Sequence, residues 1–187
     1  MQKIYCKKVN TLLRYTLPTR ELLQKVKNSF QNRFLTDQVS LRYLRDGYIK
    51  ATDIPFVKHI GLKEDEKQLS LDLKKSVCNH VETIHAAAQF TLAETESGMH
   101  LQSLFPELEK KVIPLLREAK IKYKKPATQK IVAYSSIEEE DLKKFKSQFE
   151  KKGRALLKIK IEIRDIENVL TCEAHYTWYV QAREDEL

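Results

Sequence analysis

Hydrophobic and polar positions alternate most regularly in the last third of the chain. Every second residue from 157 to 163 is a large hydrophobic residue, and a second alternating run spans 170–180. A period of two residues is typical of a strand with one buried face. The sequence Asp-Ile-Glu-Asn at 165–168 separates the two runs, so the pattern predicts a long antiparallel hairpin.

A different pattern occupies residues 79–94. Only two residues between His85 and Glu94 are polar, and this stretch has neither Gly nor Pro. Its alanines and leucine favour a helix, which we expect to run to about Gly98 or Leu104. Such a helix is apolar on nearly all sides and is therefore buried. A carboxylate in that setting is costly unless it is paired or used, which makes Glu94 the first candidate for chemistry.

Shorter patterns predict the remaining elements. In chain order, these are helices over 19–30 and 37–45, strands over 55–61 and 68–74 joined into a hairpin by a charged turn at 63–67, strands over 115–124 and 130–134, and a covering helix opened by the capping-box sequence 136–139 and ended by Gly153. The strands would enclose the apolar helix, an α+β arrangement with an antiparallel sheet.

Charge is unevenly distributed along the chain. Residues 1–50 hold 11 Lys/Arg against 3 Asp/Glu, whereas residues 51–187 hold 23 of each. We therefore predict a basic helical segment over 1–53 and a second domain over 54–187. The basic segment can be a plain solvated face, or it can meet cofactor phosphates, an anionic membrane surface or nucleic acid. Its two short helices are only a weak signal for DNA binding.

Composition narrows the classes of function. No apolar run approaches the roughly 20 residues of a membrane span, so we expect none. Three cysteines, Cys6, Cys78 and Cys172, are odd in number and far apart, which fits reduced thiols in a cytoplasmic protein. No Cys or His pair has metal-ligand spacing, so we expect neither a metal nor another cofactor.

The stretch from 79 to 94 also carries a recognisable motif. Asn79 lies six residues before His85-Ala86-Ala87, and Phe90 and Leu92-Ala93-Glu94 follow, with the acid nine positions after the His. This motif resembles that of hot-dog thioesterases of the PaaI-like and hydroxybenzoyl-CoA classes, in an uncharacterised branch. The terminal hairpin and the segment 122–127 are also similar to that family, and the resemblance covers roughly residues 54–181.

The resemblance implies a hot-dog fold, in which a curved antiparallel sheet wraps a central helix, here with extra N-terminal helices. It also implies catalytic roles: Glu94 as general base or nucleophile, with His85 and Asn79 orienting substrate or water. Ala86, Ala87 and Phe90 would bind the substrate. The family motif has Gly at positions 82, 86 and 87, where this chain has Glu, Ala and Ala. Alanine keeps the backbone N–H donors but adds Cβ atoms beside the thioester.

Each candidate also has a purely structural explanation. Glu94 can be a buried carboxylate paired across a dimer, His85 a helix cap, and Asn79 a turn residue. The leading hypothesis is an acyl-CoA thioesterase, cytoplasmic and active as a homodimer or dimer of dimers on an acyl-CoA or acyl-carrier thioester. The alternatives are a non-catalytic acyl-CoA or lipid-binding protein, and a ligand-sensing regulator with a basic DNA-binding arm. A hot-dog dehydratase is disfavoured because its His and acid follow a different local pattern.

Overall fold

The computed structural model describes residues 50–65, 68–106 and 111–183, and the predicted N-terminal helices over 19–30 and 37–45 lie outside them. The division into segments 1–53 and 54–187 stays a prediction. In chain order, the elements are η1 (Ala51–Asp53), α3 (Pro55–Ile60), β1 (Lys63–Asp65), β2 (Gln68–Leu71), η2 (Lys75–Val77), α4 (Ala86–Leu104), β3 (Val112–Tyr123), β4 (Ile131–Ser136), α5 (Glu139–Lys152), β5 (Arg154–Asp165) and β6 (Leu170–Ala182).

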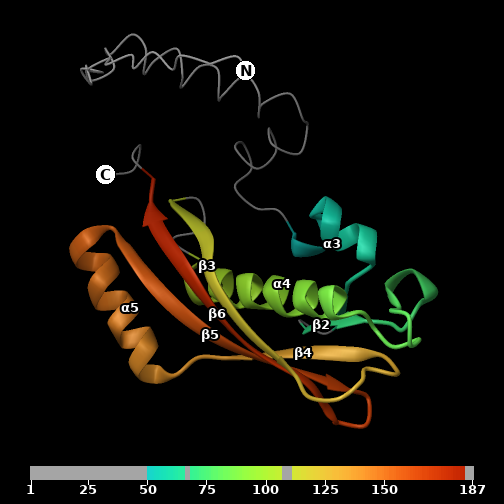
Figure 1. Cartoon of the computed structure of the whole chain (residues 1–187). Helices are drawn as coiled ribbons and strands as arrows, with labels where there is room; N and C mark the ends of the chain where they lie inside the picture. The colour runs from blue at the N-terminus through green and yellow to red at the C-terminus, as the bar shows by residue number, and fades with distance from the viewer. Residues whose placement is uncertain (1–49, 66–67, 107–110, 184–187) are drawn as a thin grey trace, which may run out of the picture. The chain divides into compact units, whose positions relative to one another are not determined.

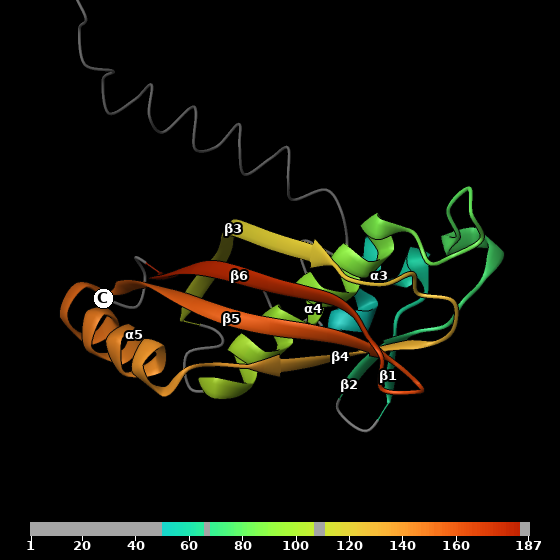
Figure 2. The same cartoon turned by 60° about the horizontal axis from the view of Figure 1, so that its bottom comes forward.

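The strands form one antiparallel sheet that curves around α4 without closing (Figures 1 and 2). Its order is β1-β2-β4-β5-β6-β3, so β5 and β6 lie in the middle and β3 forms one edge. A bulge between Leu116 and Glu118 interrupts the β3–β6 ladder. The predicted α+β fold with an antiparallel sheet around a central helix is therefore confirmed.

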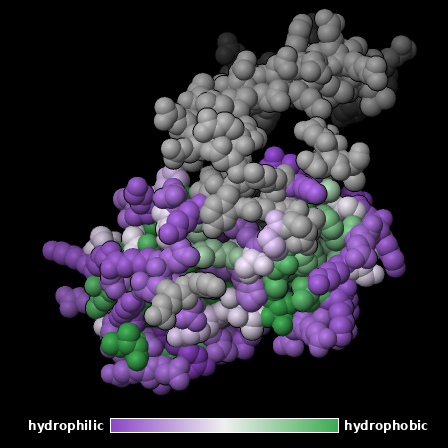
Figure 3. Space-filling model, turned by 180° about the vertical axis from the view of Figure 1, so that it is seen from behind, coloured by the Kyte–Doolittle hydropathy of each residue, from purple (hydrophilic) through white to green (hydrophobic). Residues whose placement is uncertain are grey.

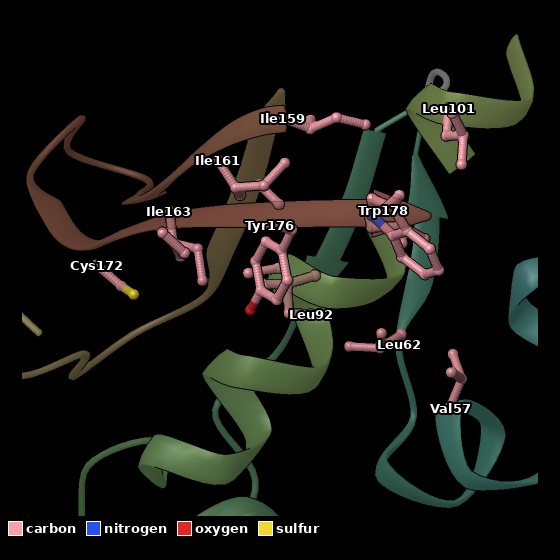
Figure 4. Close-up of a cluster of buried hydrophobic side chains, with 14 of the residues drawn as sticks. Val57, Leu62, Leu92, Leu101, Ile159, Ile161, Ile163, Cys172, Tyr176 and Trp178 are labelled. Carbon is pink, nitrogen blue, oxygen red and sulfur yellow. The ribbon is translucent and has the colours of Figure 1, made fainter. Parts of the chain in front are cut away.

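Among the described residues, the β5–β6 hairpin provides 10 of the 26 buried residues of the hydrophobic core. Its inward side chains alternate with exposed or half-buried ones along both strands, as the period of two predicted, except at Thr171, which is also buried. Figure 4 shows Tyr176 beside Leu92 of α4, with Trp178 nearer Leu101. The fully buried inward residues of the hairpin are Ile159, Ile161, Ile163, Cys172, Ala174 and Tyr176.

Helix α4 packs against strands β2, β4, β5 and β6 of this sheet. His85 is its N-cap and Phe105 its C-cap, so the predicted helix between His85 and Leu104 is confirmed. One stripe of the helix, containing Ala86, Phe90 and Glu94, is exposed or half-buried. Residues four apart share a helix face, so this stripe is continuous.

Helix α5 lies beside the first half of β5, where β4 does not extend (Figure 1). Its buried Phe145 packs between Phe105 and Phe149, with ring centroids 4.9 and 5.8 Å apart. Gly153 ends the helix with φ of 62°, in the left-handed region that glycine tolerates. The helix therefore covers one end of the core, as predicted.

Three local predictions were wrong. Residues 55–61 form helix α3, begun by Pro55 at its first turn and closed by Gly61 at φ of 77°, instead of a strand. Residues 63–65, predicted as part of a turn, form strand β1 and pair with β2. Ser136 ends strand β4 and caps nothing, because α5 begins after Glu138, which makes no side-chain cap.

Among the described residues, no helix is long and apolar enough to cross a membrane. The surface seen from the reverse of Figure 1 is largely hydrophilic, with smaller hydrophobic areas between the polar residues (Figure 3).

Candidate active site at the start of helix α4

Asn79 organises the loop that leads into α4. Its side-chain oxygen accepts hydrogen bonds from the N–H groups of Val81 at 3.0 Å and Thr83 at 3.1 Å. Its amide nitrogen donates to Thr83 Oγ1 at 2.9 Å. Asparagine side chains commonly close turns in this way. The amide is thus engaged within the loop and fixes how the chain enters the helix.

Glu82 in the same loop has φ of +60°. This left-handed conformation is unfavourable for residues with a Cβ, by about 1–2 kcal/mol. The hot-dog thioesterase motif has glycine at this position, which tolerates the conformation freely. Backbone strain is therefore stored at Glu82, an exposed residue of this loop.

His85 caps the helix with its ring. Nδ1 accepts the N–H of Ala87 at 3.0 Å, and the His85 carbonyl accepts from the N–H groups of Ala88 and Gln89 at 3.0 and 3.1 Å. A ring nitrogen that accepts a hydrogen bond carries no proton, so the neutral imidazole holds its proton on Nε2. The ring is exposed and presents that N–H to solvent.

One backbone donor remains at the start of α4. Ala86 and Ala87 are both exposed, but the N–H of Ala87 is used by His85. The N–H of Ala86 makes no hydrogen bond within the part of the chain that the structure describes. Its carbonyl accepts from the Tyr123 hydroxyl at 3.0 Å, which ties the helix to the end of β3. A free N–H at a helix N-terminus favours an anionic or developing oxyanion ligand.

Glu94 lies on the same stripe of α4, half-buried. Burial raises the pKa of its carboxyl above the ordinary value of 4.5, because the charged form is desolvated. Phe90, between Ala86 and Glu94 on the stripe, meets the ring of Tyr176 edge-on at 5.6 Å, and its carbonyl accepts from the Tyr176 hydroxyl at 3.1 Å. The stripe thus joins a helix N-terminus, an aromatic ring and a carboxyl group with a raised pKa.

These groups do not all meet within one chain. Asn79, His85 and the two alanines lie together at the start of α4. Glu94 lies eight residues beyond Ala86, and a rise of 1.5 Å per residue separates them by about 12 Å along the helix axis. The carboxylate and the free N–H of the same chain are therefore too far apart to act on one carbonyl group.

Sequence reasoning missed a second carboxylate on α4. Glu96 is only 6% exposed, and its two oxygens accept from the Leu69 N–H at 3.2 Å and the Ser135 hydroxyl at 3.0 Å. Burial raises its pKa, and these two hydrogen bonds oppose the rise. Glu96 joins the helix to β2 and β4, on the far side from Glu94. The sequence held one signal for this difference: residues two apart lie on different faces of a helix, so Glu96 and Glu94 could not share one environment.

A metal-binding cluster of three or more His, Cys, Asp or Glu residues is absent from the described part of the chain.

The profile of one family, described as Domain of unknown function (DUF4442), matches residues 48–180. A comparison with curated proteins gave no match. A probable thioesterase of unknown function from Pseudomonas aeruginosa has a similar structure, with a TM-score of 0.60 and 20% identity over 76% of this chain and 93% of that one.

Two further structures extend this likeness. A thioesterase from Haemophilus influenzae aligns with a TM-score of 0.57 and 18% identity, over 70% of this chain and 85% of its own. A Bacillus halodurans protein solved with CoA aligns with a TM-score of 0.54 and 17% identity, over 82% of this chain and 99% of its own. The similar structures are hot-dog proteins of the thioesterase family, so the predicted hot-dog fold is confirmed.

Proposed function

Since this chain belongs to the DUF4442 family and has the hot-dog fold, we propose that it is an acyl-CoA thioesterase. The observation that carries the proposal is the stripe of α4. On one face it holds the Ala86 N–H, which has no partner among the described residues, and the half-buried Glu94 carboxylate, whose pKa is raised. Thioester hydrolysis needs these two groups: a donor for the carbonyl oxygen and a base for water.

The reaction follows from the chemistry of these groups. The Ala86 N–H and the helix dipole stabilise the negative charge that develops on the thioester oxygen. Glu94 removes a proton from water as its oxygen bonds to the carbonyl carbon, and returns that proton to the sulfur of the departing thiol. The alternative is direct attack by the Glu94 carboxylate on the carbonyl carbon. This breaks the C–S bond, expels the thiolate, which takes a proton from solvent, and leaves a mixed anhydride that water hydrolyses to the free acid and the Glu94 carboxylate.

The remaining predicted site residues take positioning roles. Asn79 shapes the entry loop, and His85 occupies the Ala87 N–H while presenting its own Nε2–H to the substrate. Ala87 and Phe90 contact the acyl group from the helix face. Because the Ala87 donor is occupied, Ala86 supplies the backbone donor at this end of the helix, within the part of the chain that the structure describes.

We place each active site between two copies of the chain. If two α4 helices lie antiparallel with Phe90 near the two-fold axis, the Ala86 of one copy approaches the Glu94 of the other, which removes the separation of about 12 Å. Two surfaces support this homodimer. One is the half-exposed α4 stripe, and the other is β3, a long edge strand that would otherwise be an open template for pairing.

The substrate assignment rests on the likeness to solved structures and on the site chemistry. The Bacillus halodurans protein was solved with CoA. We propose that this chain likewise accepts a CoA thioester. We also propose a cytoplasmic location, because Cys78 and Cys172 are free thiols, as is usual in a reducing compartment.

The direct test is a panel of acyl-CoA thioesters of different chain lengths, with release of free thiol as the readout. We expect hydrolysis of at least one member, with an acid limb of the pH–rate profile above 4.5 because burial raises the Glu94 pKa. The Glu94→Gln variant should lose this activity while keeping its melting temperature. Glu150→Gln, on the exposed surface of α5, is the matched control. Full activity in Glu94→Gln would refute the role of Glu94.

The helix start also favours a second candidate, a protein that binds an acyl-CoA without cleaving it. Cβ atoms at Ala86 and Ala87 narrow the approach to the helix, and His85 occupies one of its donors. Calorimetry with a non-hydrolysable acyl-CoA analogue separates the two functions. Tight binding of the analogue without turnover of the matching thioester would select the binding protein.

A further inference from the structure

A basic groove opens on the face of the sheet that points away from α4. It has a volume of about 570 Å³ and is lined by residues of β3, α5, β5 and β6. The alternation of side chains along β5 shows which face of the sheet carries the groove. Leu156, which lines the groove, is 51% exposed, whereas its neighbour Leu157 points into the core and is 1% exposed. The groove therefore lies across the sheet from the α4 stripe and contains none of the catalytic residues proposed above.

Three cations line this groove. Arg117 comes from the bulge in β3, Lys152 from the last turn of α5, and Arg154 from the start of β5. None of them forms an ion pair with another described residue. The acid of the groove, Glu118, lies 3.3 Å from Lys120, which offsets its charge. The groove therefore holds an excess of positive charge.

The groove also has a flat, partly apolar wall. The guanidinium of Arg117 lies 5.5 Å from the centre of the Tyr179 ring, a cation–π contact that holds the arginine at the wall. Leu156 exposes half of its side chain beside it. Guanidinium groups bind phosphate through paired N–H donors, and aromatic and aliphatic side chains accept a planar base.

We propose that this groove binds a phosphorylated nucleoside. The phosphates lie against Arg117, Lys152 and Arg154, and the base lies on Leu156, beside the Tyr179 ring that Arg117 covers. The volume supports a small ligand, because small-molecule sites occupy roughly 300–1,000 Å³, whereas a docked protein segment needs a broader surface. The nucleoside can be a free nucleotide or the nucleotide end of coenzyme A, which share this chemistry.

The test is isothermal titration of the full chain with ADP at low ionic strength. We expect saturable binding that weakens about tenfold or more in the Arg117→Gln/Arg154→Gln double variant, since charge-assisted hydrogen bonds are lost. Lys122→Gln removes an exposed cation of β3 that lies outside the groove, and it should leave binding unchanged. Pyrophosphate should bind more weakly than ADP because it has no base.

Three results would overturn the proposal: no saturable binding, equal weakening by Lys122→Gln, or pyrophosphate binding as tightly as ADP. Competition by CoA would assign the groove to the nucleotide end of coenzyme A, and ADP binding unaffected by CoA would assign it to a free nucleotide. Glu94→Gln should bind ADP like the unaltered chain, so a failure of this site and a failure of the thioesterase proposal are distinguishable.

Discussion

Replacing Ala86 with proline removes one hydrogen-bond donor and leaves the helix in place. Ala86 is the first residue of α4, where proline is tolerated because that N–H has no partner inside the helix. The residue before a proline must be extended, and His85 already is, with φ of −59° and ψ of 143°. The Ala86 carbonyl, which accepts from Tyr123, is unchanged.

The expected loss is the value of one oxyanion donor. Removing such a donor costs about 2.7–4 kcal/mol of transition-state stabilisation, or about 10²–10³ in kcat. KM should change far less, because the donor acts mainly on charge that develops in the transition state. The melting temperature should stay near that of the unaltered protein, which circular dichroism would check.

A mixed dimer turns this variant into a test of the shared site. Ala86→Pro and Glu94→Gln chains, each nearly inactive alone, are co-expressed with different tags and purified as dimers that carry both. One of the two sites then combines an intact Ala86 with an intact Glu94, so about half of the unaltered activity should return. A mixed dimer as inactive as its parents, or a protein that is monomeric at assay concentrations, would refute the shared site.

The remaining predictions concern stability. Glu96→Gln should flatten the pH dependence of the melting temperature, because the pKa of Glu96 is raised in the folded state. Such a carboxyl stabilises the fold at pH below its pKa in the unfolded chain. This stabilisation is lost as pH rises through its pKa in the folded state, by about 1.4 kcal/mol per unit of difference between the two pKa values. Gly98→Ala should raise the free energy of unfolding in urea by about 0.5–1 kcal/mol, because the new Cβ would lie 3.5 Å from the Trp178 ring, an ordinary van der Waals distance. A lower free energy of unfolding would show that the Trp178 ring cannot accommodate the added methyl group. Glu82→Gly should raise the melting temperature by relieving about 1 kcal/mol of backbone strain. A lower melting temperature would mean that the conformational entropy glycine adds to the unfolded chain outweighs the strain relieved in the folded one.

The fold was predictable where the sequence pattern was long and regular. The β5–β6 hairpin carries an uninterrupted period of two, and the alanine-rich run after His85 has one dominant structure. Pro55–Ile60 was not predictable in this way, because six residues are too short for a helical period to show. Its strongest signals were the flanking ones, Pro55 at the start and Gly61 at the left-handed end.

The candidate site was predictable as a set of residues and not as a geometry. Motif spacing indicated Asn79, His85 and Glu94, but only the structure shows that the His85 ring occupies the Ala87 donor. The structure also shows that Glu96, and not Glu94, is held in the core, because Glu96 accepts hydrogen bonds from β2 and β4. Sequence periodicity places side chains on faces, and it does not say which hydrogen bonds those side chains make.

The place of β6 in the sheet has a consequence for how the protein is made. Strand β3 pairs with β6 and with no other described strand, and β6 is translated after all the other strands of the sheet. During synthesis, β3 therefore leaves the ribosome with both edges open and stays so until residues 170–182 emerge. Exposed strand edges attract other chains, so we expect this nascent protein to depend on chaperones at that stage, more than a fold whose strands pair in order of synthesis.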